Sequence, residues 1–178
     1  MLRTVVSRKW RWLGLGPFAA LAGLALVPSA PAARATAASA ATAVCSTSNL
    51  RVDKIGEQGF TSHRAWAFAL RNIGTGTCRL TGFPDARLLD RQARGISTRV
   101  SHFGGPARNV VLRPFGRSYF TLIYTVSGPC PRALFAYGVR IRPPGSSQRL
   151  VWYQGRFDVC GPAPAFVRVS PVTATRPF

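Results

Sequence analysis

The stretch "HRAWAFALRN" at residues 63–72 decides the fold class, because its large apolar side chains fall on every second position. Trp66, Phe68 and Leu70 would share one face of an extended strand, and alanines occupy the positions between them. Successive side chains of a β-strand point to opposite faces of the sheet. This period of two therefore predicts a strand with one buried face.

The same alternation recurs in "SYFTLIYTV" (118–126), "YGVRIRPP" (137–144) and "FVRVSPV" (166–172). In the last two, apolar residues point inward and the intervening Arg140, Arg142 and Arg168 point outward. Gly and Pro mark turns between these stretches, at 90–95, 113–116, 142–147 and 160–164. No helical period is visible in this part of the chain, so we expect an all-β domain, an antiparallel β-sandwich of about seven or eight strands.

The first residues have the composition of a secretory signal peptide. Residues 1–12 carry four basic residues and no acid, 13–27 are uncharged and apolar, and small residues follow up to Ala32. The apolar run is shorter than the roughly 20 residues of a membrane span. We expect cleavage near Ala32, so that residues 1–32 are the signal peptide, with an uncleaved anchor as the alternative. The mature protein would be secreted or extracellular, with cell-wall association as a narrower option, and would have no transmembrane span.

Residues 33–43 are almost entirely Ala, Thr and Ser, which predicts a disordered stem with too little apolar surface to fold. Residues 44–178, about 135 in number, are then long enough for a single β-sandwich domain. No cysteine follows the apolar run directly, as a lipid anchor would require, and we therefore expect a free exported protein.

Four cysteines, an even number in a chain expected to be exported, predict two disulfides. Three pairings are conceivable. We favour Cys45 with Cys78 and Cys130 with Cys160, because each bridge then closes a local loop of about 30 residues. No two cysteines have the short spacing of a zinc knuckle, so we expect no metal site.

The series Asn72, Gly74, Cys78, Gly82, Phe83 and Pro84 in "LRNIGTGTCRLTGFPDARLLD", with the closing "CGPAPAFVRVSPV", resembles the actinobacterial secreted domain of unknown function numbered 4232. The resemblance covers nearly all of the chain after the stem. It implies an exported or envelope protein with an immunoglobulin-like sandwich, and it implies no activity. The family commonly has Tyr where this chain has Phe83.

These motif residues have a structural interpretation. We expect Asn72 and Gly74 to adopt left-handed turn conformations after the strand that precedes them. Phe83 would pack at a sheet edge, and Pro84 would fix φ where the next strand begins. The whole segment would be a corner held by Cys78.

No catalytic motif is visible. The chain has two histidines, His63 and His102, and only five acids, and it lacks a nucleophile elbow, a glycine-rich phosphate loop and any other cofactor motif. We therefore expect no catalytic residues, no enzyme activity and no cofactor. A small hydrolase with an unrecognised site is the least favoured alternative.

The charge is the strongest remaining signal. Without the four basic residues of the leader, 20 basic residues face five acids, a net charge of about +15 that favours polyanionic partners. An arginine-rich coding bias would also raise the arginine content, but it does not account for so few acids. Arg140, Arg142 and Arg168 are the candidate anion-binding residues.

We therefore expect an envelope-associated binding or adhesion module with a basic surface for anionic polymers. The alternative is a protein-partner module, such as an inhibitor or an accessory subunit of an envelope complex. The signal peptide argues against intracellular nucleic acid as the partner. The oligomeric state and the ligand stay open at this point.

Overall fold

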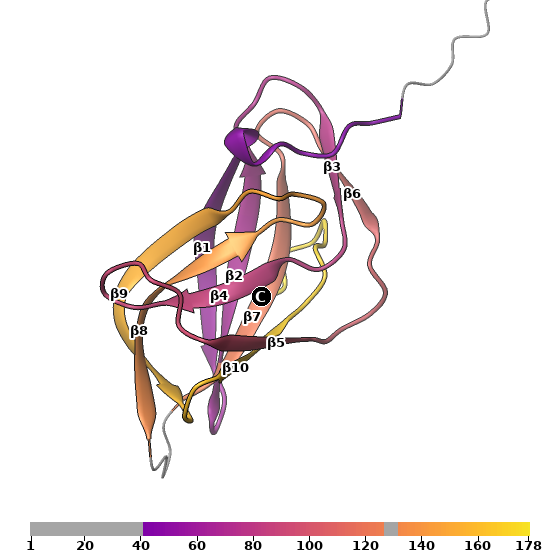
Figure 1. The fold of residues 1–178 in the computed structure, drawn as a ribbon. Coiled ribbons are helices and arrows are strands. Elements are labelled where there is room, and N and C mark those ends of the chain that lie inside the picture. Colours follow the sequence, from indigo (N-terminus) through magenta and orange to yellow (C-terminus); the bar gives the residue numbers. More distant parts are fainter. Residues whose placement is uncertain (1–40, 127–131) are drawn as a thin grey trace, which may run out of the picture. The chain divides into compact units, whose positions relative to one another are not determined.

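The computed structural model describes residues 41–126 and 132–178 (Figure 1). Within these ranges the chain forms one short 3-10 helix and ten strands, and no α-helix. In order they are η1(Thr47–Asn49), β1(Leu50–Gly59), β2(His63–Asn72), β3(Cys78–Thr81), β4(Asp85–Leu89), β5(Thr98–His102), β6(Asn109–Leu112), β7(Arg117–Thr125), β8(Ala133–Arg142), β9(Leu150–Cys160) and β10(Ala165–Val169).

The described strands form two main sheets and a two-stranded pair. One sheet has the order β1-β2-β7-β10-β5, the second has the order β4-β8-β9, and β3 pairs with β6. In Figure 1, β4 and β8 lie across β1, β2 and β7, so the two sheets form two layers. The all-β, sandwich-like architecture expected from the sequence is confirmed.

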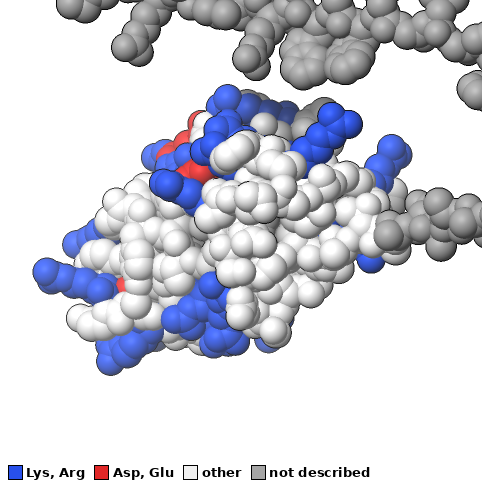
Figure 2. All heavy atoms as spheres, turned by 90° about the horizontal axis from the view of Figure 1, so that it is seen from above, with Lys and Arg blue, Asp and Glu red and all other residues white. Residues whose placement is uncertain are grey.

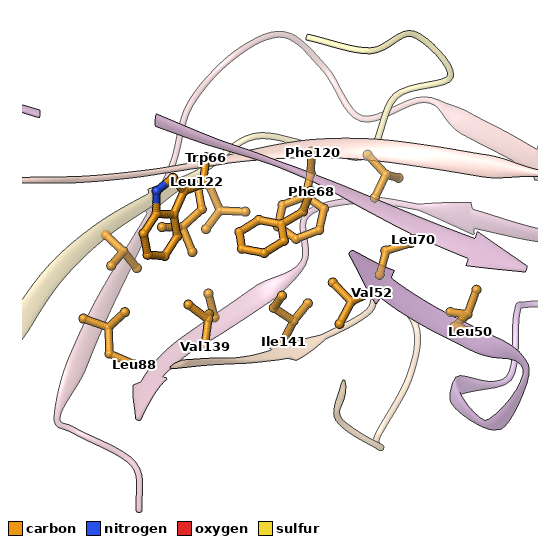
Figure 3. Packing of buried hydrophobic residues seen from close by; sticks show 14 of the residues in the cluster. Leu50, Val52, Trp66, Phe68, Leu70, Leu88, Phe120, Leu122, Val139 and Ile141 are labelled. Atoms are coloured by element: carbon orange, nitrogen blue, oxygen red, sulfur yellow. The ribbon is translucent and has the colours of Figure 1, made fainter. Parts of the chain in front are cut away.

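The core lies between these layers. Trp66, Phe68 and Leu70 of β2 are fully buried and point toward Val139 and Ile141 of β8 (Figure 3). The predicted inward and outward positions of these strands are therefore correct. Complete burial of one large apolar side chain stabilises a fold by roughly 1.5–3 kcal/mol, so this layer of side chains is what holds the sheets together.

Strand β2 is buried on both faces, which differs from the single buried face expected. The alanines between its large residues, including Ala67 and Ala69, are also buried. The C-terminal residues approach the sheet in two ways. The backbones of Thr173 and Tyr119 exchange hydrogen bonds as an antiparallel bridge beside β7. The Arg176 side chain donates to the carbonyl oxygen of Ile55 at 2.7 Å, and the ring of Phe178 packs beside Gly56, which is paired with Ala67.

Two further features differ from expectation. The described residues contain ten strands instead of seven or eight, because β3, β5 and β6 are short and have no long alternating pattern. In addition, β5 runs parallel to β10, whereas an entirely antiparallel sandwich was expected. A parallel pairing joins strands that are distant in sequence, and the residue pattern of one strand does not reveal its partner.

The first predicted disulfide is confirmed. Cys45 and Cys78 are bonded, with 4.8 Å between their Cα atoms and a sequence separation of 33. The bridge ties the start of β3 to the chain just before η1. Cys130, the partner predicted for Cys160, lies outside the described residues, and the second bridge stays a prediction.

The predicted signal peptide, 1–32, and most of the stem also lie outside the described residues. Over the ranges that are described, we find no helix with the length and hydrophobicity needed to cross a membrane.

Candidate functional site

The outer face of the β4-β8-β9 sheet carries a concentration of arginines. Val139 and Ile141 of β8 are buried in the core, so that Arg140 and Arg142 project from the opposite face. On the neighbouring strand β4, Arg87 is paired with Arg140 and Asp85 with Arg142. The alternation of two adjacent strands thus places their charged residues side by side.

These side chains line a hollow with a volume of about 250 Å³. We call it the arginine hollow. Four guanidinium groups and one carboxylate contribute to its wall, and the remaining lining residues are a threonine from β5 and an alanine. Its lining residues are Asp85, Ala86, Arg87, Thr98, Arg140, Arg142 and Arg149.

Two of the arginines are held by the loop that follows β4. The Nη2 of Arg140 donates a hydrogen bond to the carbonyl oxygen of Ala93 at 2.9 Å. Arg87 lies against Gly95 so closely that a Cβ at this glycine would be 2.5 Å from its Cδ. The Arg140 guanidinium is therefore positioned by a backbone carbonyl group, and the aliphatic stem of Arg87 packs against the backbone of Gly95.

The loop itself is ordered by Asp90, which was expected to be a turn residue. Its Oδ1 accepts the backbone N–H groups of Gln92 and Arg94, and its Oδ2 forms an ion pair with the Arg94 side chain at 2.8 Å. Although desolvation raises the pKa of Asp90, these donors lower it overall. The charged carboxylate keeps the loop folded, and Ala93 accordingly adopts a left-handed conformation with φ 61°.

Few of the described arginines that line the hollow are paired with a carboxylate. Asp85 accepts a hydrogen bond from Arg142 at 2.8 Å within the hollow. The other four acids are also engaged: Asp53 with Arg51, Glu57 with Lys54 and Arg64, Asp90 with Arg94, and Asp158 with Arg156. In the described structure, no ion pair joins a carboxylate to Arg87, Arg140 or Arg149.

The third candidate anion-binding residue lies elsewhere. Arg168 is on β10, in the five-stranded sheet, and its guanidinium lies 5.1 Å from the centroid of the Phe103 ring. The structure thus brings Arg140 and Arg142 together and separates Arg168 from them. Arg87 and Arg149 complete the hollow and were not predicted. The alternation of Arg87 with Ala86 and Leu88 was visible in the sequence, but its position opposite Arg140 depends on strand register.

The basic residues do not gather on every side of the molecule. Figure 2 shows the molecule from above the view of Figure 1, and on this side Lys and Arg project mainly around the rim of a broad uncharged area. The excess of basic residues is therefore not an even coating of this side.

The residues of the family motif, which lie between Asn72 and Pro84, make contacts within the fold. Asn72 is buried, and its Nδ2 donates to the carbonyl oxygens of Gly76, Leu112 and Arg113, while its Oδ1 accepts the N–H of Gly74. The expectation of left-handed conformations at Asn72 and Gly74 was wrong. Asn72 is extended at the end of β2, and its side chain makes the turn contacts that its backbone was expected to make.

The remaining motif residues form the corner before β4. Gly82 has the left-handed conformation, with φ 121°, and Pro84 directly precedes the strand. Phe83 stacks on His102 of β5 with 4.2 Å between ring centroids. At Gly74 a Cβ would lie 2.9 Å from Asn49, so that glycine is required by close approach and not by its φ.

The two histidines are not brought together. His63 exchanges a hydrogen bond with the neighbouring Ser62 hydroxyl at 3.0 Å, and His102 stacks on Phe83. Within the described ranges, no three His, Cys, Asp or Glu side chains are grouped closely enough to hold a metal ion. The arginine hollow is the site whose chemistry is most specific, since its guanidinium groups can bind oxyanions.

Comparison with protein families gives a match over most of the domain. A family model described as "Domain of unknown function (DUF4232)" matches residues 45–176. None of the curated proteins searched matches the chain.

Proposed function

The chain belongs to the DUF4232 family of domains of unknown function. From the residues on its surface, we propose that it is an exported, non-enzymatic module. In this proposal the module binds an anionic polymer of the cell envelope through the arginine hollow. The proposal includes the immunoglobulin-like arrangement of the sandwich and removal of the signal peptide. The matching family model supports the domain family expected from the sequence, and its description assigns no activity.

The observation that carries this proposal is the composition of the hollow. Four arginines and a single aspartate line it, and that aspartate is engaged by Arg142. Guanidinium groups are planar donors that pair well with carboxylate, sulfate and phosphate oxygens. A concave surface with a strong excess of such groups supports binding of an anion more directly than the total charge of the chain does.

Binding of a polyanion by such a surface releases counterions, and its affinity falls as salt increases. Each ionic contact contributes about 0.7–0.9 to the slope of log affinity against log salt on nucleic-acid polyanions. If all four arginines of the hollow make ionic contacts, this site contributes about three to the slope of log affinity against log salt. Arginines elsewhere add smaller contributions to the slope.

The test is retention of the oxidised domain, residues 41–178, on the envelope fraction of the producing cell across a salt series. We compare the wild type with Arg140→Glu/Arg142→Glu, which reverses two charges in the hollow. The matched control is Arg113→Glu/Arg168→Glu, which makes the same change in net charge at two exposed arginines outside it. We expect retention to be lost in the first double variant and largely kept in the second.

Two results would contradict the proposal. Equal loss in both double variants would show that only total charge matters. Absence of retention at low salt in the wild type would show that the envelope polymer is not the ligand.

A second candidate function, a protein-partner module, is favoured by the turn between β6 and β7. Phe115 is 66% exposed although it is large and apolar, and it has a left-handed φ of 64°. Such a conformation costs energy for a bulky residue, and it is retained where the surrounding structure imposes it. A salt-independent, stoichiometric complex that Phe115→Asp abolishes would support this function over the first.

A further inference from the structure

The arginine hollow has a feature that narrows the kind of anion it takes. We propose that it is a phosphate site, in which one phosphate group lies between Arg87 and Arg140. This inference rests on the proposed function and deepens it by naming the chemical group of the polymer that the module recognises.

The first step is the strand register. Arg87 and Arg140 are directly opposite each other on antiparallel strands, where Cβ atoms are about 4.5–5.5 Å apart. Like charges in this position repel each other. An anion placed between the two guanidinium groups removes the repulsion, so that the site is more favourable when occupied than when empty.

The second step is preorganisation. Arg140 is held by its hydrogen bond to the carbonyl oxygen of Ala93, and the stem of Arg87 is held over Gly95. Arginine side chains usually lose conformational entropy when they bind a ligand. In this structure part of that entropy is already lost on folding, so that less is lost on binding. Each guanidinium has five N–H donors, so Arg140 keeps donors for a ligand after its bond to Ala93.

The third step distinguishes phosphate from carboxylate. A carboxylate has two oxygens in one plane and is suited to a single guanidinium fork. Asp85 already accepts a hydrogen bond from Arg142 Nη2. A phosphate group presents oxygens in a tetrahedral arrangement and can accept from guanidinium groups on different sides. Arg87 is on strand β4, Arg140 is on strand β8 and Arg149 directly precedes β9. In the described structure, none of the three forms an ion pair with a carboxylate.

The experiment uses small probes first. Inorganic phosphate and pyrophosphate are titrated into the oxidised domain at low ionic strength and followed by NMR shifts of the arginine Nε–Hε groups, with acetate and malonate as carboxylate probes. We expect phosphate and pyrophosphate to shift the signals of Arg87 and Arg140. Acetate at equal ionic strength should bind at least about tenfold more weakly than phosphate, because a carboxylate contacts one guanidinium group where phosphate contacts two.

Two variants test the position of the bound group. Arg87→Gln removes a charged donor and should weaken pyrophosphate binding at least about tenfold. Gly95→Ala keeps every charge but displaces the Arg87 stem, since its Cβ would lie 2.5 Å from Arg87 Cδ, and it should also weaken binding. Gly59→Ala is the matched control, because nothing lies within 4 Å of its added Cβ. Thermal unfolding of each variant shows that it is folded.

The polymers then separate this inference from the proposed function. Retention on immobilised polyphosphate is compared with retention on polygalacturonate, a carboxylate polymer, and with sedimentation on phosphatidylglycerol vesicles. Preference for polyphosphate or for the vesicles supports a phosphate site and identifies a polymer or a lipid headgroup as the source. Equal, hollow-dependent binding to polygalacturonate overturns the phosphate inference and leaves the proposed function standing. Binding to none of the three overturns both.

Discussion

Arg87 of β4 and Arg140 of β8 are cross-strand neighbours, and neither forms an ion pair with a carboxylate in the described structure. The loop 90–95 holds both, through the Ala93 carbonyl oxygen and the close approach of Gly95. Two like charges have therefore been placed opposite each other and fixed there by the fold. This arrangement lowers stability locally and creates the surface that we assign to ligand binding.

Arg87→Gln is predicted to stabilise the domain when no anion is bound. The substitution removes repulsion between cross-strand like charges, an effect of about 0.2–1 kcal/mol, and keeps part of the aliphatic stem that packs on Gly95. Thermal unfolding at low salt should show the increase, and it should shrink at high salt because salt screens the repulsion. Arg113→Gln, at an exposed turn residue, is the control for net charge. Equal stabilisation in both variants would show that the register of the two strands contributes nothing.

Asn72→Ala is predicted to be among the most destabilising single substitutions outside the core. Four hydrogen bonds from the buried Asn72 amide connect the β2–β3 loop with the turn after β6. Loss of the side chain leaves buried carbonyl and N–H groups unpaired, at a cost of about 1–3 kcal/mol for each that water cannot reach. Denaturant unfolding should show a loss of at least about 2 kcal/mol. Asn109→Ala, at an exposed asparagine, should stay close to the wild type.

The strands with long alternating patterns could be predicted from the sequence, because burial acts on every second residue. Trp66, Phe68 and Leu70 were placed in the core, and Arg140 and Arg142 on the outside, from this pattern alone. The Cys45–Cys78 bridge followed from loop length. In these cases the physical constraint is local, so a short stretch of sequence contains it.

The arginine hollow could be predicted only in part, because it depends on which strands are neighbours. Arg87 and Arg140 are more than 50 residues apart in sequence, and their proximity follows from the β4–β8 register. The C-terminal residues posed the same difficulty: the alanines of β2 indicate small side chains, but not that the ring of Phe178 packs beside Gly56, the partner of Ala67. Contacts between distant segments are what a single sequence leaves undetermined.

Removal of the Cys45–Cys78 bridge is predicted to lower stability by about 3–4 kcal/mol, given the 33-residue separation of the two cysteines. The double variant Cys45→Ser/Cys78→Ser is compared with the wild type by denaturant unfolding under oxidising conditions. Because both half-cystines are replaced, no new free thiol can form a wrong pairing. A loss below about 1 kcal/mol would indicate that the unfolded chain is already constrained near these positions.

Glu57 gives the domain a predicted dependence on acid pH. Burial raises the pKa of its carboxyl group, but hydrogen bonds from Lys54 and Arg64, at 2.5 and 2.6 Å, outweigh this and lower the pKa from its ordinary value of 4.5. Lys54 also lies over the Trp66 ring, 4.8 Å from its centroid. The charged form of Glu57 thus fixes a lysine against the core at one end of the sandwich.

Because the pKa of Glu57 is lower in the folded state than in the unfolded state, its contribution to stability is present above pH 4.5 and is lost as the pH falls through the lowered folded pKa. Glu57→Gln should therefore be less stable than the wild type at pH 7, and the two should converge in acid, once the pH is below the lowered pKa of Glu57 in the folded state. Urea unfolding monitored by tryptophan fluorescence across this range measures the difference. Asp53→Asn, which removes the same charge from an exposed ion pair, gives the effect of net charge alone. A constant difference between Glu57→Gln and the wild type at every pH would show that the loss arises from packing and not from the charged carboxylate.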